Sequence, residues 1–284
     1  MKSIGFVDFY ISEWHANNYP GWIKEVNDKI GTDYEVKYAW AEQDISPVDG
    51  VSTEQWCRQR GVIRCETIAE LCEKSDAIII LAPSNPEKHL QYAKEVLPFG
   101  KRTYIDKTFA PDLKTAEEIF RIAKEHECPF FSTSALRYAQ ELEEFHNAKD
   151  YFIAGGGSNF NEYIIHTVEM AVVLLDEAVN QVKVDCVGTQ RICHLTTISG
   201  REAVIGYSPA VQFSIAAENS QGVNVQKEVV SPIFPNLIER ILQFFEDGIV
   251  PFDARQTLEV MKIRTALLEA EQELLTDSKS PLDK

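Results

Sequence analysis

The chain has 284 residues, 44% of them hydrophobic, and its formal net charge is −16 at pH 7 with a sequence pI near 4.8. This length favours two domains over one, and the apolar content is enough for a sizeable core. A surface this acidic repels nucleic-acid phosphates and anionic lipid, so neither is expected as a partner, although a local pocket can still hold a small anion.

Strand and helix patterns alternate along the first half of the chain. The clearest strand is the aliphatic run Ala-Ile-Ile-Ile-Leu at residues 77–81, which is typical of a strand covered by helices on both faces. Other strands are predicted at 4–9, 34–40, 102–105 and 129–132, and helices at 20–29, 53–60, 86–96 and 113–126. The alternation predicts an α/β fold over residues 1–133, a Rossmann-like doubly wound parallel sheet with right-handed crossovers.

The pattern changes after about residue 134. An apolar-rich helix is expected at 163–175, four antiparallel strands at 182–187, 191–197, 211–217 and 223–229, and two closing helices at 236–245 and 255–275. We therefore expect residues 134–284 to form an α+β domain on a mostly antiparallel sheet. The exposed face of such a sheet suits substrate binding or assembly into a homodimer or homotetramer.

Cysteine spacing and hydropathy indicate where the protein resides. None of the six cysteines forms a CxxC pair, and their spacing fits no zinc pattern, so free thiols are favoured over disulfides or a metal site. No apolar run approaches the roughly 20 residues that cross a membrane. We expect a cytoplasmic protein with no metal.

Ligands of doubly wound sheets bind outside the carboxyl ends of the strands, so the residues that follow each strand are the first candidates. Lys107 follows one strand, where it can hydrogen-bond a substrate hydroxyl and transfer a proton if it is partly buried. The alternative is a solvated surface lysine. His15 and Trp14 follow the first strand in a polar and aromatic cluster of the kind that carbohydrate sites use, and a packing role is an equal alternative.

A histidine and an acid share one face of the predicted apolar helix in the second half. Glu162 and His166 are four residues apart, so the carboxylate can orient the imidazole and raise its basicity. The alternatives are a core histidine and an early-helix carboxylate that complements the helix dipole.

Two stretches together resemble the Gfo/Idh/MocA family of NAD(P)-dependent sugar and cyclitol oxidoreductases. Residues 82–89 read Ala-Pro-Ser-Asn-Pro-Glu-Lys-His, and residues 100–110 contain Gly-Lys, a strand and Asp-Lys-Thr where the family has Glu-Lys-Pro. Two glycines followed by an acid and a histidine match Gly156, Gly157, Glu162 and His166, and His15 matches a histidine that the family often carries.

The resemblance implies roles for these positions. Lys107 and His166 would be the proton-transfer groups at the reacting hydroxyl, with Glu162 orienting the histidine. A nicotinamide cofactor, NAD or NADP, would contact Pro83, Ser84 and Asn85. Asp106 would either bind the ribose side of that cofactor or position Lys107. Glu42, past the second strand, could bind the adenosine ribose, which would favour NAD.

One departure concerns the family's GxGxxG turn. Its glycines fall at Asp8, Tyr10 and Glu13, and none is glycine here. The glycines let the backbone approach the pyrophosphate, whereas a tyrosine side chain fills that space and two acids repel the phosphate charge. A dinucleotide bound here would have to contact Asp8 and Tyr10, so it either shifts or has been lost.

Three functions remain open. The first is hydride transfer between a sugar, cyclitol or related polyol and a nicotinamide cofactor. The second is a family member without cofactor that acts as a small-molecule sensor or regulatory protein. The third is a non-redox acid/base enzyme that uses the same cleft.

Overall fold

The computed structural model describes residues 1–146, 148–219 and 221–277. The chain divides into two compact units, Met1–Thr133 with Phe234–Ala254, and Ser134–Ile233 with Arg255–Lys284. The sequence analysis placed residues 234–254 in the second domain, but they pack in the first unit. None of the helices in the described part of the chain is long and apolar enough to cross a membrane.

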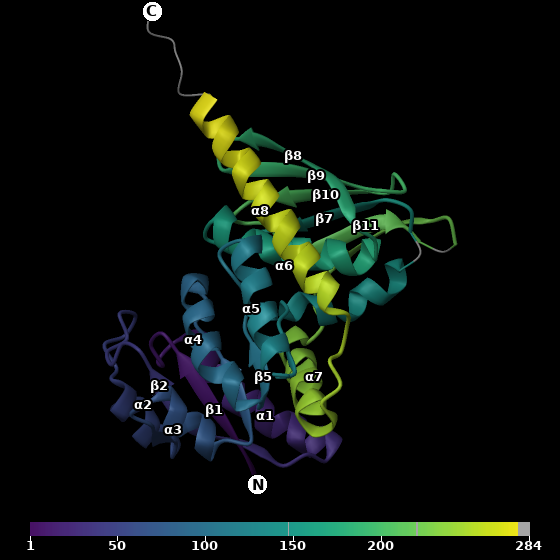
Figure 1. Ribbon diagram of the computed structural model, residues 1–284. Coiled ribbons are helices and arrows are strands. Elements are labelled where there is room, and N and C mark those ends of the chain that lie inside the picture. Colours follow the sequence, from purple (N-terminus) through teal and green to yellow (C-terminus); the bar gives the residue numbers. More distant parts are fainter. Residues whose placement is uncertain (147, 220, 278–284) are drawn as a thin grey trace, which may run out of the picture. The chain divides into compact units, whose positions relative to one another are not determined.

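The first unit is built on a six-stranded parallel sheet with the strand order β3-β2-β1-β4-β5-β6 (Figure 1). The strands are β1 (Lys2–Asp8), β2 (Tyr34–Ala41), β3 (Ile63–Arg64), β4 (Ala77–Ile80), β5 (Arg102–Ile105) and β6 (Phe130–Phe131). The order reverses beside β1, as in doubly wound sheets. Every residue of β4 is buried, as expected for an aliphatic strand covered on both faces.

Helices connect these strands. They are α1 (Trp14–Ile30), α2 (Thr53–Arg60), α3 (Ile68–Lys74), α4 (His89–Val96) and α5 (Leu113–Glu125), with short 3₁₀ turns at Pro86–Lys88 and Leu97–Phe99. The helical pattern of the sequence predicted the first helix at 20–29. The helix begins six residues earlier, at Trp14, and Pro20 lies inside it. His15 is therefore on the first turn of α1, and not in a loop.

Helix α7 (Ile233–Asp247) completes the first unit although it comes a hundred residues later in the chain. Its apolar side is buried, and the ring of Phe244 meets that of Phe131 edge-on at 5.2 Å. The Arg102 guanidinium also donates a hydrogen bond to the carbonyl of Phe245. These contacts hold α7 against β5 and β6.

The second unit is built on a mixed, mostly antiparallel sheet with the order β12-β11-β7-β10-β9-β8. Its strands are β7 (Tyr151–Gly155), β8 (Val179–Val187), β9 (Gln190–Thr197), β10 (Glu202–Tyr207), β11 (Ser214–Glu218) and β12 (Asn224–Glu228). Helix α6 (Phe160–Leu175) contacts β7 and β10, and the long helix α8 (Ala254–Asp277) runs across the strands in Figure 1. Only the central pair, β7 with β10, is parallel.

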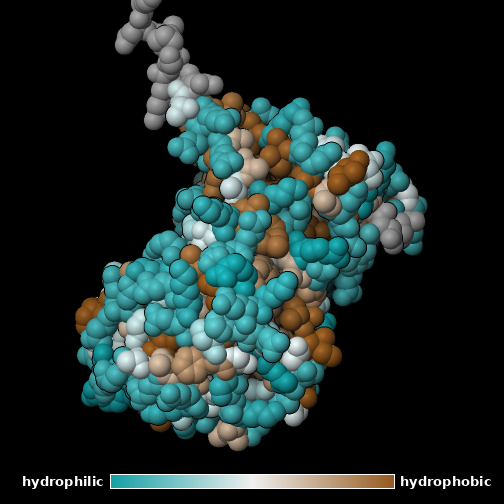
Figure 2. All heavy atoms as spheres, viewed as in Figure 1, coloured by the Kyte–Doolittle hydropathy of each residue, from teal (hydrophilic) through white to brown (hydrophobic). Residues whose placement is uncertain are grey.

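The expected fold class, a Rossmann-like α/β sheet followed by an α+β part, is confirmed. Strands β7 and β10 were missed. Strand β7 is only five residues long and ends at Gly155, directly before the two glycines of the family match. Hydrophilic residues cover most of the face in Figure 2, as expected for so acidic a chain.

Candidate functional site

The parallel order β2-β1-β4-β5 brings the carboxyl ends of four strands to one edge of the first sheet. Asp8 ends β1, and its carboxylate accepts hydrogen bonds from the backbone N–H groups of Phe9 (2.7 Å) and Ala82 (3.0 Å). Ala82, just past β4, has the positive φ of 58°, a conformation that costs a residue with a Cβ some strain. Asp106 follows β5 and is fixed through its N–H to the carbonyl of Ile80 (2.8 Å). Hydrogen bonds of the backbone and of the Asp8 carboxylate therefore connect the ends of neighbouring strands at this edge.

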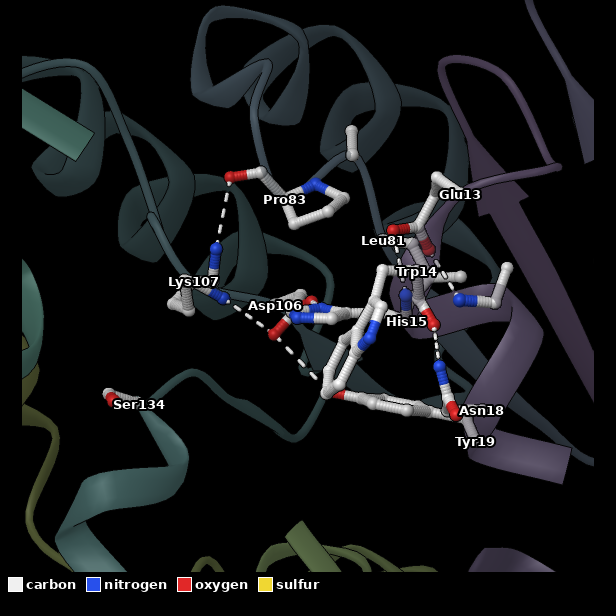
Figure 3. A network of polar contacts seen from close by, with 12 residues as sticks. Glu13, Trp14, His15, Asn18, Tyr19, Leu81, Pro83, Asp106, Lys107 and Ser134 are labelled. Atoms are coloured by element: carbon white, nitrogen blue, oxygen red, sulfur yellow. Dashed lines mark hydrogen bonds and ion pairs between the residues drawn. The ribbon is translucent and has the colours of Figure 1, made fainter. Parts of the chain in front are cut away.

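Asp106 is the centre of a buried polar network (Figure 3). One carboxylate oxygen contacts Nδ1 of His15, and the other accepts from the backbone N–H of Lys107 (2.9 Å) and the hydroxyl of Tyr104 (3.2 Å). Tyr19 stacks on the His15 ring at 5.4 Å between centroids. Burial alone would raise the pKa of Asp106, but His15 and Lys107 hold it below its usual value. The Asp106 carboxyl group is therefore ionised at neutral pH.

Lys107 is the half-buried cation of this edge. Its Nζ points toward the carbonyl oxygen of Pro83 at 3.5 Å, and Asp106 lies between it and the rings of His15 and Tyr19 in Figure 3. The structure thus brings together Lys107, Asp106, Pro83 and His15. An ammonium group held beside a carboxylate can donate a hydrogen bond to a hydroxyl oxygen and exchange a proton with it.

The other two residues of the predicted cofactor turn lie less deep. Ser84 is exposed, and Asn85 closes a tight turn by donating its N–H to the carbonyl of Ala82 (3.0 Å). The side-chain amide of Asn85 donates to the carboxylate of Glu87 (3.0 Å). The turn is therefore held by its own bonds.

The turn from β1 into α1 is closed by Glu13. Its carboxylate accepts hydrogen bonds from the backbone N–H groups of His15 (2.8 Å) and Ala16, so Glu13 is the N-cap of α1. The Glu13 side chain is only 7% exposed. Tyr10, half-buried, lies in the same turn. Two of the N–H groups that a helix leaves free for an anion are thus already bonded.

Burial raises the pKa of Asp8 well above its usual value, and the nearby charge of Glu13 raises it further. Burial also raises the pKa of Glu13, although His15 opposes that shift. Oδ2 of Asp8 is buried without a hydrogen-bond partner among the described residues. The turn is therefore buried and rich in carboxyl groups.

These residues do not fit a dinucleotide held in the way that glycine-rich turns hold one. Such turns need free N–H groups at the helix end and an open backbone beside the pyrophosphate. Here Glu13 occupies the N–H groups, and Asp8 and Tyr10 carry side chains where the turn would have none. No step of the chemistry below is routed through a dinucleotide.

Glu42, the candidate for ribose binding, is engaged as well. Its carboxylate accepts from Nζ of Lys88 (2.5 Å) and from the hydroxyl of Tyr92 (2.8 Å). Nζ of Lys88 also lies 5.1 Å from the ring centroid of Phe9. A ribose hydroxyl would have to displace one of these partners.

Trp14 borders the buried network on its solvent side. Its ring is 53% exposed, and it meets the rings of His15 (5.2 Å) and Phe234 (4.9 Å) edge-on. Trp22 stacks on Phe234 at 4.9 Å. This aromatic cluster offers a face on which the C–H groups of a sugar ring can pack.

The second unit carries the other predicted groups, both on α6. His166 contacts the hydroxyl of Ser134 through Nδ1 (2.7 Å), and Glu162 bonds the side chain of its N-cap, Asn159. The preceding glycines allow close backbone approach: a Cβ on Gly156 would lie 1.9 Å from the carbonyl oxygen of Ser208. The side chain found on His166 Nδ1 is thus Ser134, which the sequence pointed to only as a strand-end residue.

The cap formed by Glu13 was also missed, because serine, threonine, aspartate and asparagine are the usual N-caps. The pairing of His15 with Asp106 joins residues 91 apart and left no local signal. Among the described residues no group of three or more His, Cys, Asp or Glu side chains has the arrangement of a metal site. All six cysteines are free thiols.

Solved structures of dehydrogenases share this fold over nearly the whole chain. A myo-inositol dehydrogenase from Lactobacillus casei in complex with NAD(H) and myo-inositol superposes with a TM-score of 0.79 at 11% identity, covering 96% of this chain and 95% of that one. A myo-inositol dehydrogenase from Corynebacterium glutamicum gives 0.76 at 12% identity (96% and 97% covered). A probable dehydrogenase from Thermotoga maritima gives 0.76 at 13% identity (96% and 97% covered).

These comparisons define the class of fold. The chain has the two-part architecture of NAD(P)-dependent dehydrogenases, and the structural resemblance to Gfo/Idh/MocA dehydrogenases is confirmed at the level of the fold. No protein-family model matches the sequence, and no curated protein matches it. At 11–13% identity the likeness shows the fold alone.

Proposed function

We propose that this protein binds a sugar, cyclitol or related polyol at the carboxyl edge of its first sheet and that Lys107 exchanges a proton with one of its hydroxyl groups. The observation that carries the proposal is the position of Lys107, half-buried after β5 beside the buried carboxylate of Asp106. A polyol offers hydroxyl oxygens to the ammonium group and C–H faces to the ring of Trp14.

The bonds around Lys107 support a defined orientation of its amine. Asp106 holds the backbone of Lys107, and His15, Tyr104 and the Ile80 carbonyl hold Asp106. Lys107 Nζ can therefore donate a hydrogen bond to the substrate oxygen as an ammonium group, or take the hydroxyl proton as a neutral amine while the O–H bond breaks. Proton transfer of this kind needs no dinucleotide, so it suits a non-redox acid/base enzyme.

A second candidate is the oxidation of the polyol by a nicotinamide cofactor. The fold comparisons favour it, since one of the similar structures was solved in complex with NAD(H) and myo-inositol. NAD or NADP would supply the hydride acceptor for that reaction. The cofactor would have to avoid the N-terminus of α1, where Glu13 is bound.

In the second unit we propose His166 as a further proton-transfer group. Its contact with the Ser134 hydroxyl fixes the imidazole, and Glu162 supplies negative charge one turn earlier on α6. His166→Gln, which keeps hydrogen bonding but cannot transfer a proton, tests this role separately from Lys107. A loss of turnover with polyol affinity unchanged would support it, and unchanged turnover would refute it.

The experiment that tests the proposal follows a panel of sugars and cyclitols by NMR, with and without NAD(H) or NADP(H). Product formed without nicotinamide supports acid/base chemistry, and product that appears only with it, with a matching change at the nicotinamide absorbance band, supports the oxidoreductase. Binding without any turnover would leave the sensor function. Absence of polyol binding at millimolar concentration would refute all three.

Two further expectations concern location and assembly. Free thiols and an acidic surface fit the proposed cytoplasmic location. The second sheet exposes Phe152 (48%) and Val187 (67%), while their strand neighbours Ile153 and Val184 are buried. We propose that this face joins copies of the chain into a homodimer or homotetramer. Light scattering on the wild type and on Phe152→Glu tests it, since a monomeric wild type would refute it.

A further inference from the structure

The turn after β1 suggests how this chain treats phosphate. We infer that Glu13 is an internal anion that takes the place of a ligand phosphate at the N-terminus of α1, and that it excludes nucleotides and other phosphate-bearing ligands from this turn. The inference does not depend on whether Lys107 is used for catalysis.

The hydrogen bonds of Glu13 carry the first step. Both carboxylate oxygens are used, one by the N–H of His15 and one by the N–H of Ala16. A helix N-terminus binds phosphate through such N–H groups and through the positive end of its dipole. Because Glu13 satisfies both needs, a phosphate could enter only by displacing a buried carboxylate.

The surrounding side chains make that displacement unfavourable. Glu13 and Asp8 are 7% and 1% exposed, and Asp106 lies in the same cluster at 1%. Oδ2 of Asp8 is buried without a hydrogen-bond partner in the described part of the chain, so the turn offers this carboxyl group no donor that a phosphate could share. A phosphate would add charge to a cluster that already holds three acidic groups, which Coulomb repulsion opposes at this spacing.

The loop after β2 fixes the turn from outside. The hydroxyl of Ser12 donates to the carboxylate of Asp49 (2.7 Å), and the buried hydroxyl of Ser46 donates to the carbonyl of Ser12 (2.8 Å). On the other side of the cap, Asn17 accepts from the indole N–H of Trp56 (2.8 Å). The residues on both sides of Glu13 are thus held, so the cap is a rigid part of the fold.

The inference limits the class of ligand. A phosphorylated sugar, a nucleotide sugar or a dinucleotide that relies on this helix end is excluded, whereas an unphosphorylated polyol is not affected. The Glu13 side chain, already bound to the backbone, discriminates against phosphate-bearing ligands. The protein does not have to rearrange when a ligand arrives.

Three variants test the inference by calorimetric titration with pyrophosphate and ADP-ribose. Glu13→Gly frees the N–H groups, and glycine is a tolerated N-cap residue. Glu13→Gln removes the charge but leaves an amide oxygen to fill the same bonds. Glu25→Gln is the matched control, because it removes one exposed carboxylate from the same helix far from the turn. Circular dichroism of each variant verifies folding.

We expect no binding by the wild type or by Glu25→Gln at millimolar ligand, and affinity for both probes at least about tenfold higher in Glu13→Gly. Glu13→Gln should gain less than Glu13→Gly, since its side chain still occupies the helix end. If the wild type bound either probe with a dissociation constant below about 0.1 mM, the inference would be overturned. It would equally be overturned if folded Glu13→Gly and Glu13→Gln gained no more than the control.

Discussion

The two strand ends that flank β4 differ sharply. After β5, Lys107 follows a strand in the position that the resemblance to dehydrogenases implies; its backbone N–H bonds Asp106 and its half-buried amine points to the Pro83 carbonyl. After β1, the turn that would hold a dinucleotide is closed by Glu13 and lined by Asp8. The two ends are joined by the His15–Asp106 pair, yet the Lys107 side chain after β5 is half-exposed, whereas the turn after β1 is filled by the buried Glu13.

The difference teaches that a doubly wound sheet can keep its path while side chains fill the turn after its first strand. Asp8, Tyr10 and Glu13 stand in this turn, where a glycine-rich turn has no side chains. A comparison of folds does not detect these three side chains, whereas the hydrogen bonds of Glu13 reveal them.

Lys107→Ala should have the largest effect and tests whether the end of β5 is the reacting end. If the β5 end is the reacting end, loss of its proton-transfer group should reduce turnover by about 10²–10⁴-fold, a typical contribution of general acid/base groups. The measurement is steady-state kinetics on whichever polyol of the panel is converted. Lys114→Ala, which removes an exposed lysine from α5, is the control. Equal activity of the two variants would refute the role of Lys107.

Asp106→Ala tests the bond that joins the two ends. It leaves the buried His15 without its carboxylate and removes one of the hydrogen bonds of the Tyr104 hydroxyl, so we expect a loss of about 3–5 kcal/mol in the free energy of unfolding. Urea unfolding followed by tryptophan fluorescence measures it. Asp112→Ala, which removes the N-cap of α5, should cost only about 1 kcal/mol. A loss for Asp106→Ala no larger than that would contradict the central place given to Asp106.

Asp8→Asn tests the β1 end through pH. The pKa of Asp8 is raised above its usual 3.8, so the folded state binds more protons than the unfolded state, and stability falls as pH rises from 3.8 toward the raised pKa. The variant escapes this loss, which is worth about 1.4 kcal/mol for each pH unit crossed. It should therefore be more stable than the wild type at pH 7 and nearly equal to it at pH 4.

Urea midpoints between pH 4 and pH 8 measure this effect, with Asp28→Asn, an exposed aspartate of α1, as the control. Asp106 acts in the opposite sense, because its pKa is lowered and its contribution is lost as pH falls below 3.8. A gap between Asp8→Asn and wild type that stayed constant across the pH range would argue against a protonated Asp8.

Lys88→Ala should have the smallest effect. The Lys88–Glu42 pair is partly exposed and the Tyr92 hydroxyl remains on Glu42, so we expect a loss of about 0.5–1 kcal/mol that shrinks in high salt. Chemical unfolding at low and high salt measures it, with Lys94→Ala on the exposed side of α4 as the control. A loss above about 2 kcal/mol in the free energy of unfolding would mean that the Lys88–Glu42 pair stabilises the fold as much as a buried hydrogen bond does.

Sequence patterns predicted the parallel sheet well because its strands are aliphatic runs with helices between them, as at residues 77–80. They failed where structure depends on distant partners. Strand β10 is half-exposed and becomes a strand through pairing with β7 and β9, and α7 joins the first unit through Phe131, which no local pattern encodes. The residues of the candidate site also fall into those predicted by a local pattern and those that depend on distant partners. The place of Lys107 followed from its strand, whereas the cap by Glu13 and the partner of His15 depend on how the chain folds back.

The return of residues 234–254 to the first unit has a consequence for how the protein is made. During synthesis the first sheet leaves the ribosome complete by Phe131, but Phe244 and the Phe245 carbonyl that bonds Arg102 follow only after the second sheet has been translated. At about 5–20 residues per second this delay lasts roughly 6–23 s. During that interval the apolar ring of Phe131 lacks the contact with Phe244 of α7 that covers it in the folded chain.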